Sequence, residues 1–402
     1  MRTKRIILII LITLITLILA FLIYWKYFKE RKPEKPIENP PIIKDTLFDY
    51  KMIHIANKSE TNYMISPFSI GYALSILNEG ALGNTKIQID KVLGNYNLDK
   101  VTNTENKIGL SNALFIKNKY RNDIKNTYIN NIKNNYDADI LFDEFNTPKV
   151  INDYAKDKTF GMIDNVIDKI DKDFIMGIMN AIAIDVEWKH KFEGDNTYKE
   201  EFTNLDNTKQ KVDMMHSSND ITYIENENAK GIIKEYKKYG DNELIFIGIL
   251  PNNNIKEYIN KFDKNELDSL LKNKKESNAN LDINLTIPKF KYNYDYKEFK
   301  NDLKLMGITD AFDENIADFH NIINDNTNYN LYVETAIHKS VIDLNENGTK
   351  ASAITYFGMS KNTALPIQKD IINIKFDKPF FYIIKDKNSD NIWFFGTVYN
   401  LK

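Results

Sequence analysis

Apolar residues recur at helical spacing in two stretches of the first hundred residues. Ser66 and Pro67 are residue types preferred at a helix N-cap and at the first helical position. Gly80 is a typical helix end, and between them apolar side chains fall at i, i+3, i+4 and i+7: Ile70, Ala73, Leu74 and Leu77. Thr85 and Gln88 have capping-box spacing, and they predict a second helix through Ile89, Val92 and Leu93.

Other stretches alternate with period two, as strands do when one face is buried. Residues 180–188 place four large apolar side chains on one face: Ile182, Ile184, Val186 and Trp188. Residues 331–344 are a second long strand candidate. Apolar runs near the C-terminus predict further strands at 371–374, 380–384 and 392–398, with a hairpin closing across 385–391. Helices and strands without regular βαβ alternation predict an α+β fold.

Residues 1–44 have a different pattern. Residues 6–25 carry no charge, and at ~1.5 Å per residue such a run can cross a bilayer core of roughly 30 Å. The basic start of the chain also fits a signal peptide, but the apolar run is long for one and no A-x-A-like site follows. We therefore predict a transmembrane anchor (or signal peptide) at 1–25, a Pro/Lys-rich tether at 26–44 and one domain at 45–402.

Composition excludes several classes of function. The net charge is -2, from 54 basic and 56 acidic residues, so no field of one sign indicates a nucleic-acid partner. The chain has no cysteine, which excludes disulfides, thiolate nucleophiles and cysteine-type zinc sites.

Searches for catalytic and metal-binding motifs also fail. The sequence contains no G-x-S-x-G, H-E-x-x-H, G-x-G-x-x-G or P-loop motif, and its five histidines never have metal-ligand spacing. Asp386, Asn388 and Asp390 imitate the start of a calcium loop, but Asn391 and Thr397 stand where Gly and Glu are needed. We therefore expect no metal, no cofactor and no enzymatic activity.

Residues 346–357 are the most informative stretch of the chain. Between Gly348 and Gly358, small or apolar side chains alternate onto one face: Thr349, Ala351, Ala353, Thr355 and Phe357. By itself the pattern fits either an edge strand followed by a loop or a loop that is able to become a strand.

The sequence resembles the serpin family in this segment and in many others. Gly348-Thr349 followed by small residues resembles the serpin hinge, and Ala336 to Ser340 resembles the strand before it. Other blocks appear in the family's order between residues 62 and 402: Ser66-Pro67-Phe68-Ser69-Ile70, Gly80 to Thr85, Ile151-Asn152-Asp153-Tyr154, Thr159 to Ile163, Ile287-Pro288-Lys289-Phe290, Met306-Gly307-Ile308, Phe376 to Phe380 and Phe394-Phe395-Gly396.

The resemblance implies a serpin-like fold with three β-sheets, about nine helices and an exposed reactive loop. It also implies a protease inhibitor that acts as a suicide substrate: the loop is cleaved, the protease is acylated, and the loop inserts into the central sheet. The partner would be a serine, or else a cysteine, protease, and the inhibitor would be a monomer. The alternative is a non-inhibitory serpin fold that serves as a binding module.

Family positions carried over one by one give the expected site. The hinge comprises Glu346, Gly348, Thr349, Ala351, Ala353 and Thr355. The reactive bond falls at Asn362-Thr363, or at Lys361-Asn362 if the spacing slips by one residue. The region where the sheet opens comprises Ser66, Ser69, Asn180, Trp188, Lys289 and His338, with an expected ion pair between Lys289 and Glu346.

The expected localisation combines the N-terminal span with this function. An inhibitor of proteases implies a single-pass protein anchored in the membrane through residues 6–25 with its body outside the cytoplasm, or else a secreted protein. The basic residues that follow the span favour a cytoplasmic body by the positive-inside rule. The orientation therefore stays open at this point.

Overall fold

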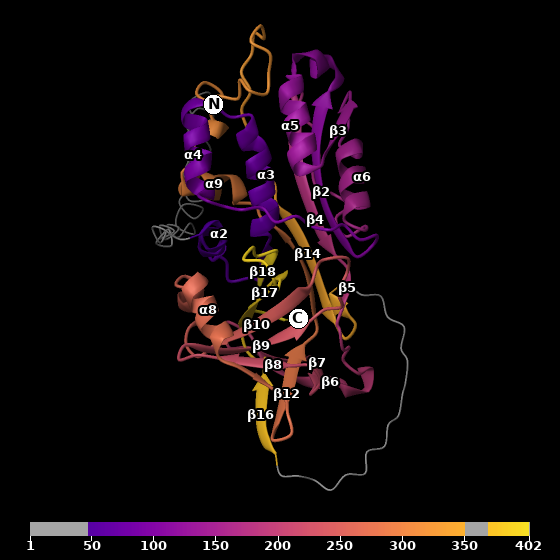
Figure 1. Cartoon of the computed structure of the whole chain (residues 1–402), viewed down its shortest axis with the longest axis vertical. Coiled ribbons are helices and arrows are strands. Elements are labelled where there is room, and N and C mark those ends of the chain that lie inside the picture. The colour runs from indigo at the N-terminus through magenta and orange to yellow at the C-terminus, as the bar shows by residue number, and fades with distance from the viewer. Residues whose placement is uncertain (1–46, 350–368, 402) are drawn as a thin grey trace, which may run out of the picture. The chain divides into compact units, whose positions relative to one another are not determined.

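The computed structural model describes residues 47–349 and 369–401. Its helix α3 begins as predicted, because the Ser66 side chain accepts a hydrogen bond from the Ser69 N–H at 3.1 Å and Pro67 is the first helical residue. The described helices are α2 (Phe48–Ala56), α3 (Pro67–Glu79), α4 (Gly83–Leu93), α5 (Asn126–Tyr136), α6 (Lys149–Lys158), α7 (Ile255–Ile259), α8 (Lys264–Lys272) and α9 (Phe299–Met306), with short 3-10 turns η1 (Asn118–Asp123), η2 (Gly194–Asn196) and η3 (Asp310–Phe312) (Figure 1).

The start of α4 corrects one prediction. The helix begins at Gly83, and no side chain caps it. Thr85 lies inside the helix and accepts a hydrogen bond from the Asp318 N–H at 2.9 Å, while the Gln88 side chain accepts one from the Thr309 N–H at 2.8 Å. The capping-box interpretation is therefore wrong, because both side chains join α4 to the 309–318 segment instead.

Two of the sheets do not include the hinge strand. The seven-stranded sheet has the order β1 (Met64–Ile65), β18 (Phe394–Val398), β17 (Phe380–Asp386), β10 (Leu244–Pro251), β9 (Ala229–Glu235), β8 (Thr222–Glu225) and β11 (Lys274–Glu276). The four-stranded sheet has the order β16 (Asp370–Lys375), β12 (Leu281–Pro288), β7 (Lys209–Ser217) and β6 (Thr197–Thr203). The predicted C-terminal hairpin is confirmed, because β17 and β18 pair antiparallel.

The remaining strands form two ladders that we call together the divided sheet. One ladder has the order β13 (Phe290–Asp295), β14 (Lys339–Asn345), β15 (Gly348–Thr349) and β5 (Val186–Glu187), and the other β3 (Ala138–Asp143), β2 (Ile108–Lys117) and β4 (Met176–Ile184). Only Asp185 separates β4 from β5, so one run of chain belongs to both ladders. If the two ladders are counted as one sheet, the fold has three β-sheets, as predicted. Its mixture of helices and strands confirms the α+β class.

The long strand predicted at 331–344 is shorter than expected. Strand β14 begins at Lys339, and its pairing with β13 ends where Asp295 faces Lys339. Because β13 extends no further, residues 331–338 have no described strand beside them and do not form one. Apolar alternation alone could not show where the partner strand ends.

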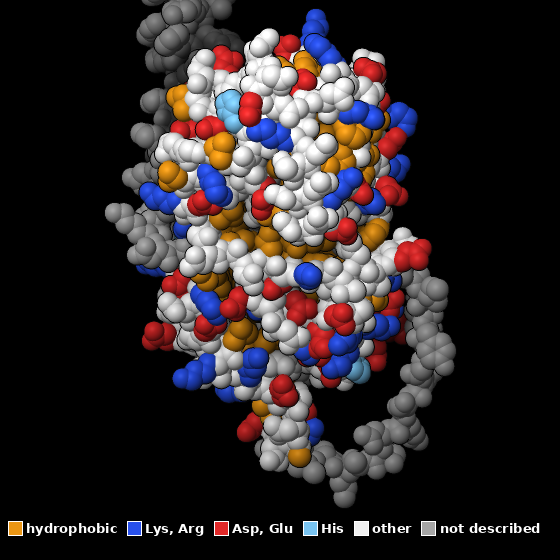
Figure 2. Space-filling model, turned by 45° about the horizontal axis from the view of Figure 1, so that its top comes forward, with side chains coloured by type: hydrophobic (Ala, Val, Ile, Leu, Met, Phe, Trp, Pro, Cys, Tyr) orange, Lys and Arg blue, Asp and Glu red, His pale blue; other side chains and the backbone are white. Residues whose placement is uncertain are grey.

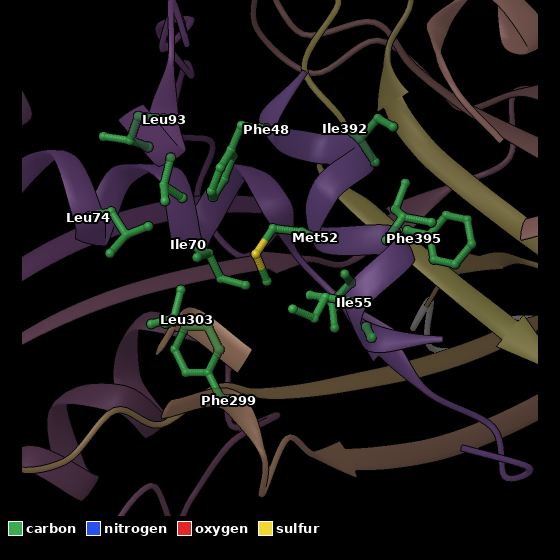
Figure 3. Close-up of a cluster of buried hydrophobic side chains, with 14 of the residues drawn as sticks. Phe48, Met52, Ile55, Ile70, Leu74, Leu93, Phe299, Leu303, Ile392 and Phe395 are labelled. Atoms are coloured by element: carbon green, nitrogen blue, oxygen red, sulfur yellow. The ribbon is translucent and has the colours of Figure 1, made fainter. Parts of the chain in front are cut away.

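Two large clusters of buried side chains fill the interior. Figure 3 shows part of the first, in which α2 packs between α3, α9 and the C-terminal strands, with contributions from Phe48, Met52, Ile55, Ile70, Leu74, Leu93, Phe299, Leu303, Ile392 and Phe395. The second cluster contains the face predicted from period two: Ile182, Ile184, Val186 and Trp188. That prediction is confirmed.

Charged side chains of both signs are interspersed on the face that Figure 2 shows. This mixture of signs agrees with the net charge of only -2.

The predicted localisation needs correction. None of the helices in residues 47–349 and 369–401 is long and apolar enough to cross a membrane. The predicted span at 6–25 and the tether at 26–44 lie outside the described residues. With no membrane-spanning helix found in the described residues, we withdraw the membrane-anchored localisation.

Candidate functional site

A gap between two strands is the main feature of the divided sheet. Strand β4 pairs with β2 on one side, and β14 pairs with β13 on one side. The edges of β4 and β14 that face each other pair with no strand below β15 in the described part of the chain. A cavity of about 70 Å³ lies between them, lined by residues 179–184 of β4 and by residues 337–342 in and just before β14. Figure 1 shows the labels of β4 and β14 next to each other, in agreement with the cavity that both strands line.

The end of α6 and the segment after it cover this gap. Ala155, Thr159 and Met162 line the cavity from that side. Beyond them, the Lys339 ammonium group donates to the Asn165 carbonyl at 3.0 Å. The covering segment is therefore tied directly to β14, one of the two strands at the gap.

The top of the gap is already occupied by the two residues of β15. Gly348 faces Asn345 and Glu187, and Thr349 lies between β14 and β5 in the same way. A Cβ atom on Gly348 would lie 2.0 Å from the Val186 carbonyl oxygen, so only glycine fits without moving a strand. Thr349 is 3% exposed, and its hydroxyl lies 2.6 Å from the hydroxyl of Tyr236.

The turn that precedes β15 is held by backbone and indole hydrogen bonds. The Trp188 indole N–H donates to the Asn345 carbonyl at 2.9 Å, and its backbone N–H donates to the Asn347 carbonyl at 2.8 Å. The Phe192 N–H donates to the Glu346 carbonyl at 3.0 Å. Trp188 and Phe192 thus fix the start of the hinge from one side.

The ion pair expected at this turn is present. The Lys289 ammonium lies 2.9 Å from a Glu346 carboxylate oxygen, and the two side chains are 37% and 18% exposed. A pair with this much solvent contact contributes about 0–1 kcal/mol. Its effect is therefore mainly to orient Glu346.

Lower in the gap, polar groups connect α3 to both strands. The Ser66 N–H donates to His338 Nε2 at 3.0 Å, just before β14. On the other side, the Ser69 hydroxyl donates to the Asn180 side-chain oxygen of β4. Asn180 in turn donates to the side chain of Asn112 on β2 at 2.7 Å. The four residues carried over from the family lie together, and the start of α3 bridges both sides of the gap.

His338 acts here as a neutral hydrogen-bond acceptor. Burial lowers its pKa from 6.5 to about 4, because a charged imidazolium is poorly solvated inside the protein. The ring is therefore uncharged near neutral pH, with Nε2 free to accept from Ser66.

Sequence reasoning missed three residues of this site. Asn112 is buried within an apolar strand, and a lone amide in such a run is a signal that could have been noticed. The Ser340 hydroxyl donates to the Met64 carbonyl at 2.5 Å, and Tyr236 bonds to Thr349. The roles of Ser340 and Tyr236 depend on contacts between distant segments, which periodicity does not show.

Several predicted residues fall outside the described ranges. These are the hinge residues Ala351, Ala353 and Thr355 and the reactive-bond candidates Lys361, Asn362 and Thr363. The reactive bond therefore stays a prediction.

Within residues 47–349 and 369–401, no group of three His, Asp or Glu side chains could hold a metal ion. The calcium-like stretch forms a turn, in which Asp386 accepts from the N–H groups of Glu243 and Asn388 at 2.7 and 2.9 Å. Its side chain is thus used to shape the backbone.

Comparison with known proteins agrees with this architecture. A family model described as serpin (serine protease inhibitor) matches residues 46–401. An uncharacterized serpin-like protein of Methanosarcina mazei is 32% identical over 358 residues, which is 84% of this chain and 81% of that protein. A serine protease inhibitor of Mus musculus is 31% identical over 376 residues, covering 87% of this chain and 81% of the mouse protein.

One of the similar solved structures is known in two states. The native state of tengpin, a thermophilic serpin, superposes with a TM-score of 0.75 and 32% identity, covering 92% of this chain and 96% of that chain. Its latent state gives a TM-score of 0.71 over the same share of this chain. The described residues are thus more similar to the native state.

Proposed function

Because this chain belongs to the serpin family, we propose that it inhibits a target protease by acting as a suicide substrate. The nucleophile of the protease attacks the carbonyl carbon of the reactive bond, the new amino terminus leaves, and an acyl-enzyme forms. The freed hinge then inserts between β14 and β4 and carries the attached protease with it before water can release it. In this proposal the inhibitor supplies no catalytic group.

The observation that carries this proposal is the gap in the divided sheet. In residues 47–349 and 369–401, β4 and β14 face each other with edges that pair with no strand below β15, and the start of the hinge occupies the top of the space between them. An inserted strand would continue β15 downward and pair with both edges. The buried position of Thr349 supports a hinge whose Thr349 face, including Ala351, Ala353 and Thr355, enters the interior.

The energy of such an insertion can be bounded. A protein hydrogen bond contributes a net ~0.5–1.5 kcal/mol, and a strand that pairs on both sides over eight or so residues adds on the order of ten bonds. The ladder alone then yields on the order of 10 kcal/mol. That is comparable to the whole stability of a typical domain, so insertion would be irreversible in practice.

The remaining predicted residues take their place in this proposal. Cleavage at Asn362-Thr363 would indicate a protease that tolerates asparagine, whereas cleavage at Lys361-Asn362 would indicate a trypsin-like one. Lys289, Trp188 and His338 would be among the residues that control when the strands separate. The domain that does this is proposed to span 45–402.

Incubation with a panel of serine and cysteine proteases tests the proposal. We expect at least one protease to form a covalent complex that survives denaturing electrophoresis, with cleavage near residue 362 established by mass spectrometry. Cleavage of the loop by a protease that escapes the complex should raise the melting temperature sharply. If no protease forms a complex and the cleaved protein melts no higher than the intact one, inhibition is refuted and a binding module takes its place.

A further inference from the structure

Lys234 is an unusual residue in the interior of this fold. It lies on β9, faces Phe246 of β10, and is 1% exposed. The pairing of β9 with β8 stops one residue before Lys234, where Ile233 faces Thr222, the first residue of β8, so Lys234 lies beyond the end of that ladder. Lysine is almost never fully buried unless it is paired.

The ammonium of Lys234 has few partners. Among the described residues it donates one hydrogen bond, to the Asn219 carbonyl, and that bond is 3.5 Å long. It lies 4.8 Å from the ring centroid of Phe192 and 5.8 Å from that of Trp188. Among residues 47–349 and 369–401, Lys234 takes part in no ion pair. The acid that acts on it electrostatically is Asp220, but the Asp220 carboxylate lies 2.7 Å from His190 Nε2 and pairs with that ring.

The rings over this ammonium belong to the residues that fix the hinge. Trp188 and Phe192 donate to the carbonyls of Asn345, Asn347 and Glu346. Trp188 also stacks on Tyr236 with ring centroids 4.3 Å apart, and Tyr236 bonds to Thr349. One layer of aromatic side chains thus separates the buried charge from the start of the hinge.

We propose that Lys234 is a positioning residue that promotes opening at the top of the divided sheet. Its buried charge is stabilised by ring faces and one long hydrogen bond, which is less than water would provide. When Trp188 and Phe192 move away with the hinge, water reaches the ammonium and that cost is relieved. The charge therefore destabilises the closed arrangement and lowers the barrier to opening.

The pH dependence follows from the same placement. Burial lowers the pKa of Lys234 from 10.5 to about 8, so the folded protein gains stability as the pH rises through 8 toward 10.5, where only the unfolded chain still binds the proton. The other titratable groups that face this region are Asp220, His190 and Tyr236. Burial raises the pKa of Tyr236 further above its usual value, so Tyr236 stays neutral while Lys234 loses its proton between about pH 7.5 and 10.

Hydrogen exchange of the backbone amides in residues 340–349 tests this inference. Lys234→Met keeps the length of the side chain and removes its charge, and Lys230→Met changes a half-buried lysine on the same strand. At pH 7.5 we expect opening to be about tenfold slower in Lys234→Met than in the wild type and unchanged in Lys230→Met. The difference should disappear by pH 10, where the wild-type lysine is neutral.

Equal exchange in the wild type and Lys234→Met at pH 7.5 would overturn the inference, as would a difference that persists at pH 10. Lys234→Arg, which keeps a charge at every pH, should open at least as fast as the wild type throughout. The inference rests on the proposed function, because opening of the sheet matters only if the hinge inserts. The hydrogen-exchange measurement itself needs no protease. If the wild type forms a covalent complex but Lys234→Met exchanges as the wild type does, only the role of Lys234 is disproved. If the exchange difference is found but no protease forms a complex, only the inhibition is disproved.

Discussion

Replacing Thr349 with arginine is the most direct perturbation of the proposed mechanism. Thr349 is buried between β14 and β5 in the intact protein, so the substitution acts on the native hinge as well as on insertion. The ladder partners Leu344 and Val186 and the hydroxyl of Tyr236 offer no carboxylate to a guanidinium. We therefore expect Thr349→Arg to expel β15 from the top of the gap.

The magnitude can be worked out from these contacts. In the intact protein, expulsion leaves the buried Tyr236 hydroxyl without Thr349, which costs about 1–3 kcal/mol. During insertion, burying an unpaired guanidinium costs several kcal/mol, and this second cost is the one that slows insertion. A penalty of about 3 kcal/mol slows insertion by roughly 100-fold, since each 1.4 kcal/mol is a factor of ten. Hydrolysis of the acyl-enzyme then overtakes trapping, and the variant becomes a substrate.

The assay counts the inhibitor molecules consumed for each protease inactivated. The wild type and Thr349→Ser, which keeps the hydroxyl, should yield mostly covalent complex, whereas Thr349→Arg should yield cleaved protein and active protease. Thr208→Arg, in the exposed β6–β7 turn, is the matched control and should behave as the wild type. Melting of the uncleaved variants confirms that each is folded. Complex formation by Thr349→Arg at the wild-type stoichiometry would refute insertion at this residue.

Three further substitutions test single features of the site. Because the pKa of buried His338 is lowered to about 4, the wild type should lose about 3 kcal/mol of stability as the pH falls from 6.5 to 4; denaturant titrations of His338→Gln should show a flatter dependence. Gly348→Ala would place a Cβ 2.0 Å from the Val186 carbonyl oxygen, so faster hydrogen exchange in β15 is expected, and unchanged exchange would contradict it. Lys289→Ala should cost at most about 1 kcal/mol in unfolding experiments, no more than Lys291→Ala, which breaks a neighbouring pair on β13.

Local sequence signals predicted the elements whose stability is local. The start of α3 follows from Ser66 and Pro67 alone, because a cap and a fixed φ act within one turn. The Thr85–Gln88 pattern looked equally local, but a contact 233 residues away occupies Thr85. Propensity and spacing cannot show that a distant residue takes the hydrogen bond that a cap would make. They also cannot show that β14 begins only where its partner β13 ends.

The candidate site depended on resemblance rather than on periodicity. Ser66 and His338 are 272 residues apart in the chain, and Ser69 and Asn180 are 111 apart. No pattern within either segment brings these pairs together. The resemblance offered no position for Tyr236 or Lys234, and no local pattern indicated that either residue contacts the hinge region.

The geometry of α3 separates the barrier to insertion from its driving force. The first turn of α3 is bonded to His338 on one side of the gap and to Asn180 on the other. A new strand requires about 4.8 Å between neighbours, so α3 cannot keep both bonds while β14 and β4 move apart. The loss of one polar contact therefore resists the first step, and the ladder formed afterwards provides the gain. Residues at the start of α3 should accordingly alter the rate of insertion far more than the stability of the inserted product.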